Sequence, residues 1–124
     1  MVKVFLPGMI KRKVGSIVAI SSIAAKMTVP FAVVYCATKY GVDGLMNSLF
    51  DELCVENYDD FIDLTTVYPG FINTRKELGD VMDEIDDLVP RMTPDFVADE
   101  IVKGVLMRKK KILIAPFTLY SVIQ

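Results

Sequence analysis

The alternation of short apolar runs with longer helical patterns is the feature that most constrains the fold. Residues 15–21 form a run rich in Ile and Val, without the alternating polar residues of a half-exposed strand. Such runs are typical of strands covered on both faces in a parallel sheet. Residues 61–68, closed by Pro69-Gly70, and residues 112–115 have the same character. The sequence therefore predicts three buried strands.

Helical patterns precede and separate these strands. Residues 1–13 predict the last turns of an amphipathic helix with a basic C-terminal end, and Pro7 must sit at a kink or near the start. Another helix begins at Thr93-Pro94 and runs to Met107, because Thr93 caps the first turn and proline suits the first helical position. Strand, helix, strand, helix, strand is the order of a doubly wound, Rossmann-like parallel α/β sheet.

The longest helical pattern covers residues 34–57. Apolar side chains recur there at successive i+4 steps, which predicts packing in the core or against another subunit. The row consists of Ala37, Gly41, Leu45, Leu49 and Leu53. Polar residues, among them Asp43, lie mostly on the other faces of this helix.

Length and composition narrow the class of protein. A chain of 124 residues with 52% apolar and 24% charged side chains is one globular domain at most. The net charge of −2 gives no reason to expect a nucleic-acid partner. There is no histidine, and Cys36 and Cys54 lie about 27 Å apart on one predicted helix. We therefore expect neither a disulfide between these cysteines nor a zinc site.

Three residues form a pattern suited to proton transfer without histidine. Tyr35 and Lys39 are four residues apart, so a helix puts them on one face. An ammonium beside a phenol favours the phenolate and brings its pKa from about 10 towards neutrality, where a general acid or base works best. Ser22, on the turn after the first predicted strand, can hydrogen-bond the oxygen that gains or loses the proton. Taken alone, a Tyr-Lys pair of this kind more often lies on a helix surface.

In their context, these residues resemble the short-chain dehydrogenase/reductase family. The context is an apolar strand ending in Ser21-Ser22, then Pro30, then Tyr35-Cys-Ala-Thr-Lys39, and finally Tyr68-Pro-Gly-Phe-Ile-Asn-Thr74. Family members carry these features in this order, and the resemblance covers essentially the whole chain.

The resemblance implies a role for each residue of the pattern. It makes Tyr35 the group that gives or takes the proton at the carbinol oxygen. Lys39 lowers the pKa of the phenol and holds the nicotinamide ribose. Ser22, rather than its neighbour Ser21, orients the substrate oxygen, because the thirteen-residue spacing to Tyr35 fits Ser22. The implied cofactor is NAD or NADP.

A second segment matches the part of the family that holds the nicotinamide amide. Its residues are Pro69, Gly70, Ile72 and Thr74. A plain strand-to-loop turn would also account for a Pro-Gly pair, and both descriptions can hold together. The seven glycines form no glycine-rich turn for a pyrophosphate, which family members carry upstream. Residues 1–124 are therefore expected to be the C-terminal portion of a single Rossmann-type domain, with the first βαβ units absent.

The resemblance is strongest to the branch that oxidises or reduces retinoids, steroids and other lipid alcohols. Enzymes of that branch are usually anchored to the endoplasmic reticulum or to lipid droplets, which is the expected location, with the cytoplasm as the alternative. Residues 108–123 are basic and then apolar. This stretch fits either a peripheral contact with a membrane surface or a helix end followed by a buried strand.

Two classes of function remain open. The first is an NAD(P)-dependent oxidoreductase that transfers a hydride between nicotinamide and an alcohol or carbonyl, with Tyr35 as general acid/base. The resemblance implies that such an enzyme forms a homodimer through the helices at residues 1–13 and 34–57. The second is a truncated, non-catalytic fragment that acts at most as a dimerisation module, and the missing phosphate-binding half motivates it.

Overall fold

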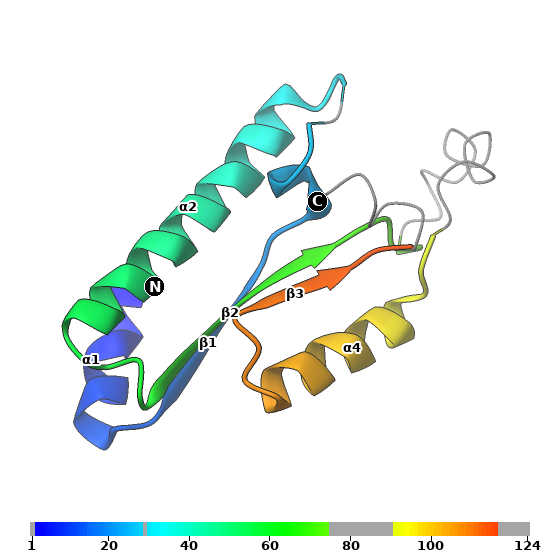
Figure 1. The fold of residues 1–124 in the computed structure, drawn as a ribbon. Helices are drawn as coiled ribbons and strands as arrows, with labels where there is room; N and C mark the ends of the chain where they lie inside the picture. The colour runs from blue at the N-terminus through cyan, green and yellow to red at the C-terminus, as the bar shows by residue number, and fades with distance from the viewer. Residues whose placement is uncertain (1, 29, 75–90, 117–124) are drawn as a thin grey trace.

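The computed structural model describes residues 2–28, 30–74 and 91–116. In chain order the elements are α1 (Val2–Arg12), β1 (Gly15–Ile20), the short 3-10 helix η1 (Ile23–Ala25), α2 (Val33–Val55), β2 (Ile62–Pro69), α4 (Pro94–Leu106) and β3 (Lys111–Ile114) (Figure 1). The strands form one parallel sheet in the order β1-β2-β3. The predicted alternation of strands and helices is confirmed.

Helices cover both faces of this sheet. On one face α1 and α2 pack over β1 and β2, where Met46, Leu49 and Leu53 meet Ile62 and Leu64. On the other face α4 packs over β2 and β3, as Figure 1 shows. The buried side chains of that second cluster are Val67, Val97, Ile112 and Ile114. Strand β2 is central, which explains why its sequence is almost continuously buried.

One edge of the sheet is open in the described part of the chain. Strand β1 pairs with β2 along one side only. Ile17 and Ala19 pack beneath α1 and α2, whereas Val18 and Ile20 point to the opposite face, where they are 39% and 50% exposed. Parallel sheets normally have both faces covered. The uncovered face of β1 is therefore a surface suited to further packing.

The long apolar row of α2 packs in the core at its C-terminal end and is exposed towards its N-terminal end. Leu49 and Leu53 are buried, but Leu45 is 58% exposed and Ala37 and Gly41 are exposed as well. A row of i+4 steps rotates by about 40° per step around a helix of 3.6 residues per turn. The row therefore winds from the solvent side onto the sheet.

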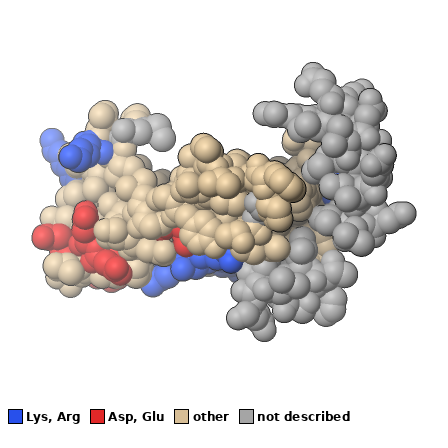
Figure 2. Space-filling model, turned by 90° about the horizontal axis from the view of Figure 1, so that it is seen from above, with Lys and Arg blue, Asp and Glu red and all other residues tan. Residues whose placement is uncertain are grey.

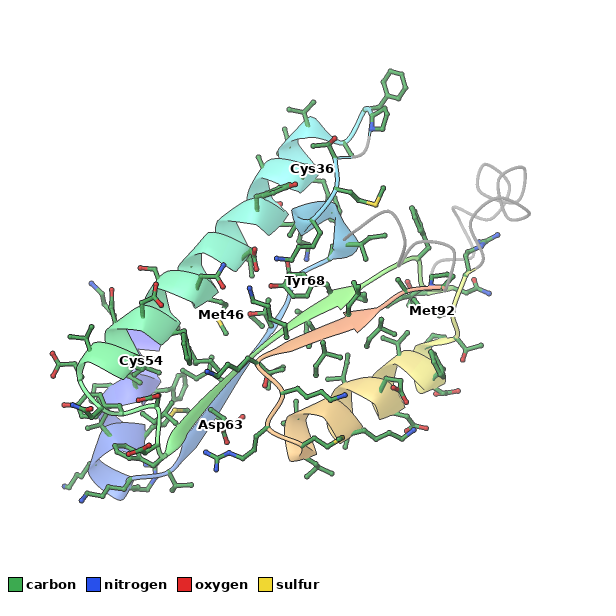
Figure 3. All side chains as sticks on the ribbon, viewed as in Figure 1. Cys36, Met46, Cys54, Asp63, Tyr68 and Met92 are labelled. Carbon is green, nitrogen blue, oxygen red and sulfur yellow. The ribbon has the colours of Figure 1, made fainter. Side chains whose placement is uncertain are left out.

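Several smaller expectations were modified or fall outside the described residues. Pro7 lies inside α1 beyond its first turn, where a proline removes one backbone donor. The expected loop after β1 contains η1. The two cysteines lie at opposite ends of α2 and are free (Figure 3). The dispersed carboxylates from Glu77 to Asp87, whose spacing predicts solvated surface rather than a metal site, lie outside the described residues.

The described part of residues 108–123 is a helix end followed by a strand. Ile112 and Ile114 are buried against α4, and Arg108 Nε donates to Asp63 Oδ1 at 2.8 Å. This was one of the two descriptions that the sequence left open. Across the described ranges, no helix combines the length and the hydropathy needed to cross a bilayer.

The contact between α4 and β3 generates a stability prediction. A Cβ at Gly104 would clash with the buried side chain of Ile112, 2.8 Å from its Cγ1, whereas nothing lies within 4 Å of a Cβ at Gly44. Gly104→Ala should lower the free energy of unfolding by about 1–3 kcal/mol through overpacking. Gly44→Ala should raise it by up to about 1 kcal/mol through helix propensity. Urea unfolding followed by far-UV circular dichroism measures both, and equal stability of the two variants would contradict the packing described.

Candidate active site

The predicted site residues come from segments that meet at one edge of the sheet. Parallel strands end at a common carboxyl edge, and the loops there are where ligands bind in open α/β folds. Ser22 is the second residue after β1, and Gly70 follows β2 directly. Helix α2 begins at the same edge and carries Tyr35 and Lys39 in its first turns.

Tyr35 and Lys39 are neighbours in the structure, as their spacing predicts. The Lys39 ammonium lies 5.6 Å from the centroid of the Tyr35 ring. It also donates to the carbonyl oxygen of Ile20, the last residue of β1, at 3.3 Å. The Tyr35 side chain is half exposed, and its hydroxyl has no hydrogen-bond partner within the described residues. An accessible phenol beside a fixed ammonium is thus available to a bound molecule.

Ser22 and Ser21 are both buried but make different contacts. The Ser22 Oγ accepts a hydrogen bond from the Ala24 amide at 3.1 Å and so caps η1. The Ser21 Oγ donates to the carbonyl oxygen of Lys39 at 3.2 Å, which ties the end of β1 to α2. In the described part of the chain, no hydrogen bond joins Ser22 to Tyr35 or Lys39. The structure therefore brings two of the three predicted catalytic residues into direct contact.

The segment from Pro69 to Thr74 is held against the end of β3 and the start of the α4 region. The Gly70 amide donates to the carbonyl oxygen of Ile114 at 2.8 Å. A Cβ at Gly70 would stand 3.4 Å from that same oxygen, in ordinary van der Waals contact, so the segment lies directly against the end of β3. Ile72 forms an isolated parallel bridge with Met92. Thr74 is exposed at the end of the segment. This geometry is compatible with both descriptions of Pro69-Gly70, as a strand-to-loop turn and as part of a ligand-binding segment.

A polar network of three residues lies beneath the site. The Lys26 Nζ donates to Asp43 Oδ2 at 2.8 Å, and the Tyr68 hydroxyl donates to Asp43 Oδ1. The Lys26 ammonium also lies 4.4 Å from the centroid of the Tyr68 ring. Figure 3 shows Tyr68 between β2 and α2. The network thus joins the segment after η1, helix α2 and the carboxyl end of β2.

Burial and hydrogen bonding act together on the three pKa values. Burial alone would raise the pKa of Asp43, but hydrogen bonds from Lys26 and Tyr68 outweigh burial and lower it. Burial alone would lower the pKa of Lys26, but its hydrogen bond to Asp43 and the neighbouring Tyr68 side chain raise it. Burial and the hydrogen bond to Asp43 raise the pKa of Tyr68. At neutral pH the network is an ion pair with a protonated phenol.

Sequence reasoning missed this network. Asp43 was assigned to the polar faces of α2, yet its side chain is only 14% exposed. One signal was present, because Asp43 follows Lys39 by four residues and so continues the row of Tyr35 and Lys39. No local pattern marks Lys26 or Tyr68 as its partners, since they lie 17 and 25 residues away.

Comparisons with known proteins were consistent with one family. Residues 1–81 match the family model described as short chain dehydrogenase. Estradiol 17-beta-dehydrogenase 11 from Pongo abelii is 33% identical over 112 residues, covering 90% of this chain and 36% of the relative. Dehydrogenase/reductase SDR family member 7B from Xenopus laevis is 36% identical over 122 residues, covering 91% and 36%. The chain thus spans about a third of the length of these curated relatives.

A solved structure supports the same fold. The short chain dehydrogenase/reductase SDR from Burkholderia phymatum, solved in complex with NAD, has a TM-score of 0.77 to this chain at 19% identity. The match covers 98% of this chain and 50% of that one. The Rossmann-like architecture expected from the sequence is therefore confirmed.

The Asp43 network generates a pH-dependent stability prediction. Because the pKa of Asp43 is lowered on folding, its contribution is present above its ordinary value of 3.8 and is lost as pH falls through the lower folded value. Asp43→Asn should lower the free energy of unfolding by about 1–3 kcal/mol at neutral pH. The difference from wild type should shrink below pH 3.8.

Urea unfolding at a series of pH values measures this difference. Asp51→Asn, at an exposed position of the same helix, is the matched control and should stay close to wild type throughout. A difference for Asp43→Asn that stays constant down to acidic pH would argue against an ionised carboxylate in the network.

Proposed function

The chain belongs to the short-chain dehydrogenase family, and on that premise we propose that it carries the proton-transfer site of an NAD(P)-dependent oxidoreductase acting on CH–OH groups. The observation that carries the proposal is the accessible Tyr35 phenol beside the Lys39 ammonium at the carboxyl edge of a parallel sheet. This is the edge where ligands of open α/β folds bind.

Tyr35 acts as the general acid/base in this proposal. In the reducing direction its hydroxyl gives a proton to the carbonyl oxygen, and in the oxidising direction its oxygen takes the proton of the alcohol. Lys39, held by the Ile20 carbonyl, stabilises the negative charge that forms on the Tyr35 oxygen. Ser22 orients the substrate oxygen. Its Oγ accepts from the Ala24 amide, so its hydroxyl hydrogen is available for donation.

NAD or NADP is the proposed cofactor, and when bound it would supply or accept the hydride. Tyr35 and Lys39 would contact its ribose end. The turn that begins at Pro69 and Gly70 and includes Ile72 and Thr74 would hold its amide end. These residues fit that end of the molecule, because the turn is fixed to β3 and leaves Thr74 exposed. The seven glycines of the chain form no cluster suited to the pyrophosphate.

Residues 1–124 form the C-terminal portion of a single Rossmann-type domain in this proposal. Two observations support it. The described part of β1 has an open edge with Val18 and Ile20 exposed beside it. The curated relatives are matched over 36% of their length. A strand and a helix from the rest of such a domain would cover this surface.

The proposed substrate class is a retinoid, steroid or other lipid alcohol or ketone. The name of one matched relative, estradiol 17-beta-dehydrogenase 11, supports a steroid-like carbinol. The endoplasmic reticulum or the lipid droplet is the matching location, with peripheral membrane association. The alternative function remains a non-catalytic module, and the experiment on Tyr35 below separates the two.

A homodimer through α1 and α2 is the proposed assembly. Large apolar side chains are exposed on both helices, including Val4 at 74%, Phe5 at 58% and Leu45 at 58%. A groove between these helices, lined by Val2, Leu6 and Leu45, has a volume of ≈ 250 Å³, which is small for a ligand site. Exposed apolar side chains on two neighbouring helices are suited to a subunit contact. Figure 2 shows that the described charged side chains gather mainly towards one end and along one edge of the face seen from above.

Tyr35→Phe is the variant that tests catalysis. It removes the proton donor and keeps the ring beside Lys39, so carbonyl reduction should fall by about 10²–10⁴-fold. Tyr40→Phe, at a similarly exposed position of the same helix, is the control and should keep its activity. Oxidation of NADH and NADPH with a steroid ketone, followed by absorbance, measures both variants. A folded wild-type chain that neither binds nor oxidises either cofactor would favour the non-catalytic module.

Leu45→Asp is the variant that tests the dimer. A carboxylate on the proposed contact would be desolvated on association, so the variant should be a monomer where the wild type is a dimer. Light scattering coupled to size-exclusion chromatography measures the mass. Asn47→Asp adds the same charge at another exposed position of α2 and should leave the mass unchanged. Identical masses for wild type and Leu45→Asp would refute this interface.

A further inference from the structure

Helix α2 is held to the sheet by different contacts at its two ends. Towards its C-terminus the buried apolar side chains Met46, Leu49 and Leu53 pack against the sheet. Between Val33 and Asp43, the stretch that carries Tyr35, the one buried side chain is Cys36. At this end of α2 the helix itself therefore contributes little apolar burial, although the buried residues Ile23–Ala25 of η1 lie against it.

Hydrogen bonds join the N-terminal half of α2 to the sheet. Ser21 and Lys39 join α2 to the end of β1 through two hydrogen bonds, from Ser21 Oγ to the Lys39 carbonyl and from Lys39 Nζ to the Ile20 carbonyl. Within the described residues, the hydrogen bond between Tyr68 and Asp43 is the one that joins α2 to β2. The same carboxylate also accepts from Lys26. Asp43 thus stands where three segments meet.

We propose that Asp43 is a positioning residue, which clamps the Ser22 turn, the Tyr35–Lys39 face of α2 and the entry to the Pro69-Gly70 turn in one fixed arrangement. This inference rests on the proposed function. The two hydrogen-bond partners of Asp43, Lys26 and Tyr68, are the arms of this clamp, and each lies close in sequence to a segment of the proposed site. Lys26 lies four residues after Ser22, and Tyr68 directly precedes Pro69.

The geometry of α2 explains why a residue at position 43 can orient Tyr35 and Lys39. Asp43 is one turn beyond Lys39, which is one turn beyond Tyr35, so the three residues follow one side of α2. Two hydrogen bonds to different oxygens of one carboxylate, from different directions, oppose rotation of the helix about its axis. Hydrogen bonds depend on direction more strongly than apolar contacts do, so the clamp adds a directional constraint to the packing of α2 on the sheet and on η1.

The first test is amide hydrogen exchange of the full chain without ligand. Asp43→Ala removes both arms and should raise the exchange rate of the Ala24 amide, in the Ser22 turn, and of the Gly70 amide by about tenfold or more. The Leu64 amide, in the middle of β2, should change much less. Asp51→Asn, at an exposed position of α2, is the control. Equal changes at all three amides would show a general loss of stability and overturn the proposal.

A second test remains decisive if Asp43→Ala does not fold. The chain has no tryptophan, so the fluorescence of its five tyrosines can be measured directly. A tyrosine whose hydroxyl donates to a carboxylate fluoresces weakly. Asp43→Asn should raise tyrosine emission in the wild-type background and not in a Tyr68→Phe background. Lys26→Met should raise exchange at Ala24 and leave Gly70 less affected. A rise in emission that is the same in both backgrounds would overturn the clamp.

Kinetics separate this inference from the proposed function. In an active enzyme Asp43→Asn should lower kcat by about tenfold with KM nearly unchanged, because substrate still binds but the reacting groups are misaligned. Asp51→Asn should change neither constant. If Tyr35→Phe leaves activity intact, the proposed function fails, whereas the exchange and emission results still decide whether the clamp exists.

Discussion

The structure depends on the burial of strand β2 on both faces and along both edges. Its neighbours β1 and β3 satisfy its backbone hydrogen bonds, and helices cover it from both sides. Parallel neighbours require crossover connections, and helices α2 and α4 supply them. As a direct consequence, all three strands end at the same edge. The residues of the proposed site are gathered there because the loops that leave this edge are close in space and far apart in sequence.

The two halves of α2 are held to the rest of the structure by different kinds of contact. Its C-terminal half packs on the sheet through buried apolar side chains, which require area and shape but little direction. Its N-terminal half is held by directional contacts from Ser21, Lys39 and Asp43. Burying a charged carboxylate is costly unless it is paired, and Lys26 and Tyr68 meet that condition together. Precise orientation is therefore concentrated at the end of the helix that a ligand would contact.

Membership of the short-chain dehydrogenase family is consistent with both the content and the extent of the chain. The described residues form the carboxyl edge of three strands, and the open edge of β1 leaves an apolar surface for more of the sheet. The Tyr35–Lys39 contact is local to one helix and needs no more of the domain to form. A dinucleotide is a long ligand, and the contacts proposed for Tyr35, Lys39 and the turn after Pro69 involve one end of it.

The sequence by itself determined the order and type of the elements, the parallel sheet and the neighbourhood of Tyr35 and Lys39. These follow from short-range periodicity, since side chains four apart on a helix share a face wherever the helix packs. The tertiary structure decided which turns of α2 are buried, because an i+4 row winds around the helix and only the sheet selects its inner side. It also decided the partners of Asp43, because Lys26 and Tyr68 reach that carboxylate only after the crossover places α2 above β2.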